Sequence, residues 1–191
     1  MPWQIMQRRQ QQNLIAGIIA AIGLVLVSAV GWFYLKQFRT ISYENSRYGF
    51  ALKYPAAWSF AENLGGAAAV FVSPKEHALD IFQENVNVVV QDISRNPMGL
   101  AEYTETAITQ MRAVFGTNLE ILDSSPALID GREGHQFGFI GKGPDGNFQY
   151  MCRWTIVGTS AYQITYTAME SGYPKLLPQA ERMIRSFKIR R

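Results

Sequence analysis

The sequence predicts an α+β domain built on a mainly antiparallel sheet and preceded by one membrane-spanning helix. An apolar run from Leu14 to Leu35 contains no charged residue and no proline. Downstream of it, segments with period-two alternation of apolar side chains are joined by short turn sequences typical of hairpins. Two further segments have apolar residues spaced three and four apart, as in amphipathic helices. Because these helices do not alternate regularly with the strands, the pattern favours the α+β class over a parallel α/β fold.

The apolar run sets the domain organisation. At ~1.5 Å rise per residue, a helix of this length crosses a hydrocarbon core of roughly 30 Å. We therefore divide the chain into a basic N-terminal head (1–13), a transmembrane helix (14–35), a linker (36–42) and one domain (43–191). The first predicted partner of the protein is thus the lipid bilayer, contacted through residues 14–35.

The basic residues beside the run do not decide its orientation. Arg8 and Arg9 precede it, and Lys36 and Arg39 follow it. A long downstream domain is translocated largely regardless of its charge, and a signal-anchor usually keeps its N-terminal flank in the cytoplasm. We therefore expect a cytoplasmic N-terminus and an extracytoplasmic domain in the periplasm, at the cell surface or in the thylakoid lumen. The alternative is a cleaved signal peptide, with the small residues of 27–29 as the cleavage site.

The net positive charge of the whole chain does not describe the domain that follows the apolar run. The chain has 18 Lys and Arg against 15 Asp and Glu, a net charge of +3 and a pI near 9.0. The basic excess flanks the apolar run, whereas every acidic residue follows it, so the domain is nearly neutral. This excludes a general polyanion-binding surface, and we predict no nucleic-acid partner.

The first half of the domain contains three predicted strands and one helix. Pro55 ends the first strand because proline has no N–H to donate, and the helix closes near Gly116. The expected elements are strands at Tyr48–Tyr54, Ala68–Val72 and Asn85–Ile93 and a helix from Leu100 to Val114.

The second half is a series of strands followed by a helix. Glycine-rich connections at 141–146 and 158–160 are hairpin sequences. Pro178 is expected in the first turn of the last helix, which leaves its start at Tyr173 or later. The expected strands are Leu119–Asp123, Ala127–Ile129, Glu133–Ile140, Asn147–Val157 and Ala161–Ala168, and the helix ends at Arg185.

The sequence contains few residues suited to catalysis. Its histidines are His77 and His135, and its single cysteine is Cys152. His135 alternates with phenylalanines on a predicted strand, which favours a hydrogen-bonded core histidine over a general base. Cys152 shares a strand face with aromatic residues and is predicted to be a buried small hydrophobe. We predict that the protein is not an enzyme and holds no cofactor.

A metal- or small-ligand-binding domain remains the alternative. His77, Asp80 and Glu84 are three and four residues apart and would share one face if their segment were helical. An imidazole with two carboxylates suits a divalent transition metal. The turn sequence that opens this segment instead favours solvated loop residues, so we assign no metal site.

Four segments, in order, resemble the PsbP/Mog1-like superfamily. Tyr43–Trp58 resembles its opening, in which a Gly-Phe strand ends in Tyr-Pro and a Trp. Asp80–Val90 looks like its Asn-Val-Asn-Val strand, and Gly158–Ala168 is similar to its Ala-Tyr-x-Ile-Thr-Tyr-Thr-Ala strand. Ile184–Ile189 resembles its terminal Ser-Phe signature.

The resemblance implies an α/β/α sandwich around an antiparallel sheet and a non-enzymatic, partner-binding role. Plant and cyanobacterial PsbP proteins of that superfamily support photosystem II on its lumenal side, whereas many bacterial relatives have no assigned activity. The apolar run of this chain stands in place of a transit peptide or a lipid-bearing cysteine. We therefore expect an accessory domain that binds or stabilises a membrane protein complex, with a photosystem role only in a phototroph.

Overall fold

The computed structural model describes residues 23–28, 31, 39–77 and 80–190. The chain divides into two units, Met1–Arg39 and Thr40–Arg191. In the first unit, residues 23–28 are α-helical. Most of the predicted span 14–35, and all of the head 1–13, lie outside the described residues. Within the described residues, no helix is long and apolar enough to cross a membrane.

The second unit contains two antiparallel sheets. A three-stranded sheet has the order β1-β2-β10, and a seven-stranded sheet has the order β3-β4-β5-β9-β8-β7-β6. The elements are β1 (Thr40–Asn45), β2 (Phe50–Pro55), β3 (Ser59–Leu64), β4 (Ala67–Val72), β5 (Asn85–Asp92), α2 (Leu100–Phe115), a short 3₁₀ turn η1 (Gly116–Asn118), β6 (Leu119–Ile129), β7 (Arg132–Gly143), β8 (Gly146–Val157), β9 (Ser160–Met169), α3 (Tyr173–Arg185) and β10 (Lys188–Ile189).

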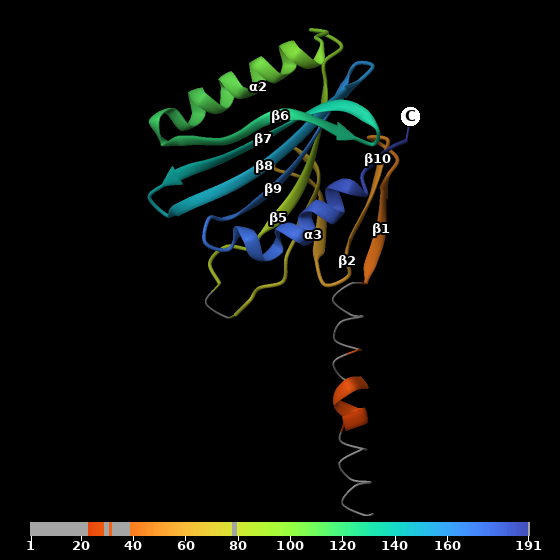
Figure 1. The fold of residues 1–191 in the computed structure, drawn as a ribbon. Helices are drawn as coiled ribbons and strands as arrows, with labels where there is room; N and C mark the ends of the chain where they lie inside the picture. The colour runs from red at the N-terminus through yellow and green to blue at the C-terminus, as the bar shows by residue number, and fades with distance from the viewer. Residues whose placement is uncertain (1–22, 29–30, 32–38, 78–79, 191) are drawn as a thin grey trace, which may run out of the picture. The chain divides into compact units, whose positions relative to one another are not determined.

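The two helices cover opposite faces of the large sheet. On the central strand β9, Tyr162, Ile164 and Tyr166 are buried in the core that includes α3, whereas Ala161 belongs to the core beneath α2. Successive side chains of a strand point to opposite faces, so this alternation places a helix on each side. In Figure 1, α2 runs along β6 and β7, and α3 crosses the central strands on the other side. The predicted α+β class with an antiparallel sheet is confirmed.

Several predicted elements have different bounds in the structure. Strand β1 was not predicted; it exists because Thr40 to Asn45 pair with the whole of β2. The exposed strand β3 was not predicted; it exists because it pairs with β4. The two short strands predicted around Pro126 form one strand, β6, with a bulge between Ile121 and Asp123. Proline is tolerated there because β6 is an edge strand.

The last helix begins at Tyr173 and keeps Pro178 beyond its first turn, contrary to the expectation. Its first turn is closed by a bond from Lys175 N to Gly172 O (3.0 Å), so the helix is established before the proline is reached. Pro178 removes one further backbone bond. Burial of Ala180 and Met183 on the α3 face of the sheet offsets that loss.

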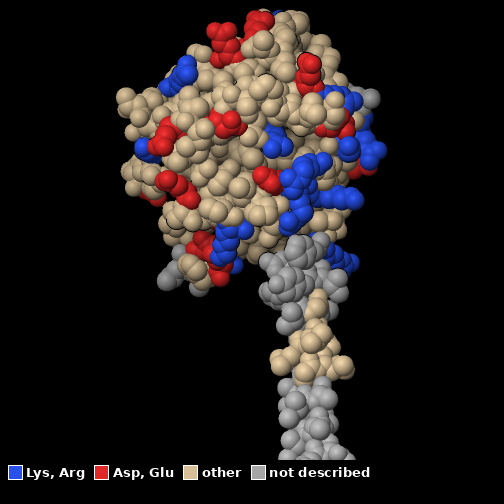
Figure 2. All heavy atoms as spheres, in the orientation of Figure 1, with Lys and Arg blue, Asp and Glu red and all other residues tan. Residues whose placement is uncertain are grey.

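Charges of both signs are interspersed on the domain face shown in Figure 2. Lys and Arg gather beside the C-terminal end of α3, but acidic residues accompany them. Arg185 pairs with Glu181 at 3.0 Å, and Lys188 pairs with Asp130 at 2.8 Å. This view therefore shows no extended surface of a single sign.

Candidate functional site

The residues of the predicted metal alternative do not share a helical face. The described parts of their segment, 73–77 and 80–84, are irregular. The Asp80 carboxylate accepts backbone N–H bonds from Glu76 (3.1 Å) and Phe82 (3.2 Å). The Glu76 bond is the main reason that the pKa of Asp80 is lowered. Asp80 thus closes a local turn.

Glu84 is held away from the other two residues. Its side chain is buried, with 6% of the residue exposed, and its Oε2 accepts a hydrogen bond from Ser73 Oγ at 3.0 Å. Across the part of the chain that the structure describes, no three His, Cys, Asp or Glu residues form a metal-binding group. The helical premise of the metal alternative is therefore wrong.

Cys152 is the buried small hydrophobe that the sequence predicts. It lies in the core beneath α2, and Thr165 Oγ1 donates a weak hydrogen bond to its Sγ at 3.5 Å. Burial raises the pKa of the thiol to about 11. Because the thiolate is the nucleophilic form, this cysteine is chemically inert at neutral pH.

His135 is hydrogen-bonded as predicted, but it is not fully in the core. The half-buried ring stacks on Trp154 with centroids 5.3 Å apart, and its Nε2 lies 3.0 Å from Ser124 Oγ. Burial lowers the pKa of His135, and the nearby Asp123 only partly opposes this shift. The ring is therefore mainly neutral at pH 7. Its edge faces a pocket rather than packed side chains.

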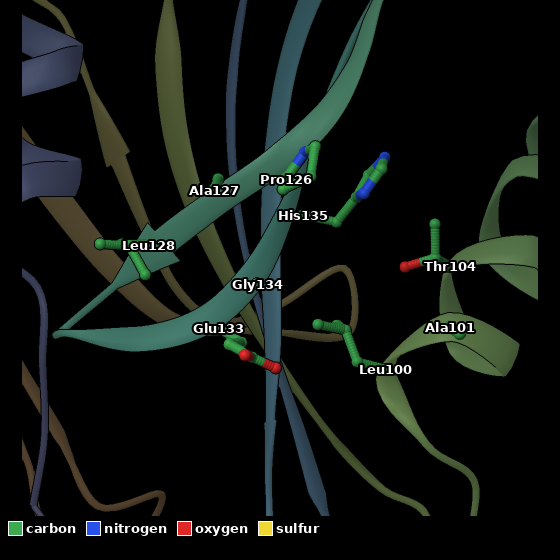
Figure 3. A pocket seen from close by; sticks show the side chains of 9 residues that line it. All are labelled: Leu100, Ala101, Thr104, Pro126, Ala127, Leu128, Glu133, Gly134 and His135. Atoms are coloured by element: carbon green, nitrogen blue, oxygen red, sulfur yellow. The ribbon is translucent and has the colours of Figure 1, made fainter.

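This pocket has a volume of about 650 Å³ and lies between the N-terminal part of α2 and the end of the β6–β7 hairpin (Figure 3). Its walls are predominantly apolar. The lining residues are Leu100, Ala101, Thr104, Pro126, Ala127, Leu128, Glu133, Gly134 and His135. Leu128, one of these lining residues, is 69% exposed. A cavity of this size and composition is typical of a binding site.

Trp154 lies buried behind the lining residues Thr104 and His135. Its Nε1–H donates to Thr104 Oγ1 at 2.8 Å, which ties the sheet to the first turns of α2. Beside it, Gly134 has no side chain, and a Cβ at this position would lie 2.6 Å from the Trp154 carbonyl oxygen. Glycine is therefore required for β7 to lie this close to β8. Among the lining residues the only hydroxyl, that of Thr104, already accepts this hydrogen bond from Trp154.

One carboxylate, that of Glu133, lines the pocket, and two more glutamates are close to its lining residues in the sequence of α2. In Figure 3 the Glu133 carboxylate points from β7 toward Leu100 on α2. On α2, Glu102 and Glu105 are exposed and lie in the same helical turns as the lining residues Ala101 and Thr104. The ion pairs found within the described residues involve none of these three glutamates.

The pocket does not present the parts of a hydrolytic site. Ser124 and His135 are adjacent, but the Asp123 carboxylate accepts bonds from Ser125 (3.0 Å) and Gln136 (2.7 Å) instead of from the imidazole. A carboxylate that does not contact the histidine cannot orient it as a base. What this arrangement offers is an apolar cavity with a neutral imidazole and carboxylates at its border.

Sequence reasoning missed this pocket because its walls come from segments far apart in the chain. Two local signals were present. A glycine inside a strand, such as Gly134, often marks a close backbone approach, and Pro126 marks an edge strand. Neither signal indicates that α2 begins opposite the hairpin, which is a property of the tertiary packing.

The family comparison identifies the domain. The sequence profile of the PsbP family matches residues 39–189, nearly the whole of the second unit. The chain belongs to the PsbP family. This confirms the resemblance seen in the sequence motifs, and the PsbP domain coincides with the folded unit that begins at Thr40. No curated protein sequence matches this chain.

Solved structures show the same fold at low sequence identity. Cyanobacterial PsbP from Synechocystis is 14% identical with a TM-score of 0.59, over 78% of this chain and 92% of that one. LpqN, involved in cell envelope biogenesis of Mycobacterium tuberculosis, is 13% identical with a TM-score of 0.61, over 80% and 91%. The Saccharomyces cerevisiae Ran-binding protein Mog1p is 11% identical with a TM-score of 0.54, over 79% and 95%.

Proposed function

We propose that this protein is a single-pass membrane protein whose PsbP domain lies outside the cytoplasm and binds a protein partner through the pocket between α2 and the β6–β7 hairpin. The domain acts as a non-catalytic accessory module, and its partner is a subunit of a membrane protein complex. The membrane location rests on the apolar run Leu14–Leu35 and on the length of the domain that follows it.

The pocket is the observation that carries the binding role. Exposed apolar surface that is continuous with a preformed apolar cavity is characteristic of an interaction site. Here Leu128 is 69% exposed next to a cavity of about 650 Å³. The Thr104 hydroxyl already accepts a hydrogen bond from Trp154, so the cavity offers mainly apolar contact, with Glu133 and His135 as its other polar groups.

The related structures support a protein ligand. Mog1p, which shares the fold, is a Ran-binding protein, and LpqN is involved in cell envelope biogenesis. A PsbP domain held at a membrane is suited to a similar use of its surface, with a neighbouring membrane subunit as the ligand.

The binding role is tested by filling the pocket. Ala101 lines it and is exposed on α2, so Ala101→Trp fills the cavity without disturbing the core. Ala113→Trp is the matched control, because Ala113 is also an exposed alanine of α2 but lies in the last turns of the helix. Both variants and the wild type are purified from chemically crosslinked native membranes, and co-purified proteins are quantified by mass spectrometry. We expect a defined partner to be lost with Ala101→Trp and retained with Ala113→Trp.

Equal recovery of all co-purified proteins with both variants would contradict a pocket-mediated partner. The predicted topology is tested separately by fusing a proximity-labelling enzyme after Arg191. Labelling of extracytoplasmic and membrane proteins is expected, and labelling of cytoplasmic proteins would overturn the orientation.

A further inference from the structure

We infer that the pocket recognises a partner segment in which an apolar side chain is followed or preceded by a lysine or arginine. The inference rests on the proposed function and adds the chemistry of the ligand. The apolar side chain enters the cavity between Leu100 and Pro126, and the cation lies at the border beside Glu133.

Electrostatics at the border favour a cation. Glu102, Glu105 and Glu133 each contribute one negative charge, and they are absent from the ion pairs of the described residues. The N-terminus of α2 lies at the same place and contributes about +0.5 of an elementary charge. The pKa of His135 is lowered by burial, so at neutral pH the ring adds little positive charge. The charged group that lines the pocket is therefore the Glu133 carboxylate, which favours a cation over a carboxylate-bearing ligand.

The shape and lining favour a single inserted side chain with an adjacent cation. The cavity walls are formed by leucine, alanine and proline side chains, which match an aliphatic or aromatic group. A lysine or arginine next to that group can lay its methylene stem on the exposed Leu128 while keeping its charged end in water near Glu133. A cation alone would leave the apolar walls unfilled.

The edge strand argues against the main competing mode of peptide binding. β6 forms one wall of the pocket and is the last strand of the large sheet, so a partner could in principle add a strand to it. Pro126 removes a backbone donor from β6, and the bulge between Ile121 and Asp123 interrupts its regular edge. Both features are known to suppress edge-to-edge pairing. Recognition therefore depends on an inserted side chain.

The test uses peptide selection on the purified full-length chain in detergent. Phage-displayed random peptides are selected on the wild type after depletion on Ala101→Trp, and the best binders are synthesised with a fluorescent label. We expect the enriched peptides to share an apolar residue adjacent to a lysine or arginine. In fluorescence anisotropy, their affinity should fall about threefold with Glu133→Gln or Glu105→Gln and about tenfold with both, as expected for loss of exposed ion pairs. Raising the salt concentration to about 0.5 M should weaken binding to the wild type further.

Glu44→Gln is the matched control. Glu44 is an exposed glutamate on β1, away from the pocket lining, and its replacement changes the net charge of the chain by the same amount. It should leave peptide affinity unchanged. A loss equal to that of Glu133→Gln would show a non-local charge effect and overturn the inference.

Three other results would also overturn the inference. Enriched peptides without a basic residue, or with affinity that is insensitive to Glu133→Gln and Glu105→Gln together, would remove the charge requirement. In that case the proposed function still stands if Ala101→Trp alone abolishes partner capture from membranes. A wild-type dimer by light scattering that Ala101→Trp converts to a monomer would identify a second copy of this chain as the occupant.

Discussion

Gly134 controls how closely β7 approaches β8 beneath the pocket. A Cβ there would lie 2.6 Å from the Trp154 carbonyl oxygen, closer than real contacts allow. We expect Gly134→Ala to lower the free energy of unfolding by about 1–3 kcal/mol, the usual cost of overpacking. Gly138→Ala on the same strand is the control, because its nearest atom lies at 3.5 Å. Urea denaturation of the Thr40–Arg191 unit measures the stability of both variants. Equal denaturation midpoints for Gly134→Ala and Gly138→Ala would contradict the close approach of β7 to β8.

Cys152 makes the stability of the domain decrease at alkaline pH. Burial raises the pKa of its thiol from the ordinary 9.0 to about 11. A raised pKa in the folded state means that stability is fully present below pH 9 and is lost as the pH rises toward 11. The loss attributable to this group is about 2–3 kcal/mol.

The Cys152→Ala variant isolates this effect from the tyrosines. Burial raises the pKa values of Tyr43 and Tyr173 to about 12, so they also destabilise the fold at high pH. We expect the difference in unfolding free energy between wild type and Cys152→Ala to shrink between pH 9 and pH 11. A constant difference over that range would show that the thiol is not buried as described.

At the scale of elements, Asp130 connects the β6–β7 turn to β10. Its carboxylate accepts hydrogen bonds from Lys188 Nζ (2.8 Å), Ile189 N (3.1 Å) and Arg132 (2.5 Å). Burial alone would raise the pKa of Asp130, but these bonds outweigh it and lower the pKa. The backbone of Asp130 has φ 51°, which asparagine also tolerates.

Asp130→Asn should therefore remove the charge while keeping the turn. We expect the free energy of unfolding to fall by about 1–3 kcal/mol at pH 7, because the hydrogen bonds to Lys188 and Arg132 are charge-assisted. A lowered pKa means that this stability is present at neutral pH and is lost as the pH falls through the pKa of Asp130. The unfolding free energies of the wild type and Asp130→Asn, measured by urea denaturation, should thus differ at pH 7 and become equal at strongly acidic pH. Asp145→Asn, in the exposed β7–β8 turn, is the control and should match the wild type at both pH values.

Local signals in the sequence predicted some elements well. Helix α2 was expected to end near Gly116 from its apolar spacing, and its C-cap is Gly116. Strand β3 could not be predicted because all of its residues are exposed and its existence depends on pairing with β4. The continuity of β6 through Pro126 depends in the same way on its edge position.

The site was less predictable than the fold. The alternation of His135 with Phe137 and Phe139 correctly indicated a strand, and both phenylalanines are buried. It did not reveal that His135 faces a cavity, because the opposite wall is supplied by Leu100 and Thr104 on another element. The spacing of His77, Asp80 and Glu84 was misleading for the converse reason: helical spacing has no meaning in an irregular segment.

At the scale of the whole molecule, the proposed function joins a proposed membrane anchor to a PsbP domain whose apolar pocket is lined by one carboxylate, that of Glu133. An anchor at Leu14–Leu35, as proposed, would hold the domain near membrane proteins and so raise the effective concentration of a partner subunit. A modest pocket is therefore sufficient for association, since the affinity of the isolated contact need not be high.

Site-specific photo-crosslinking in native membranes tests whether a protein partner occupies the pocket. A photoreactive phenylalanine derivative replaces Ala101 inside the pocket or Ala113 near the other end of α2. We predict a discrete crosslinked adduct with one protein from position 101, no such adduct from position 113, and loss of the 101 adduct when Glu105 and Glu133 are both changed to Gln. The same protein adduct from both positions, or no protein adduct from position 101, would contradict partner binding through this pocket.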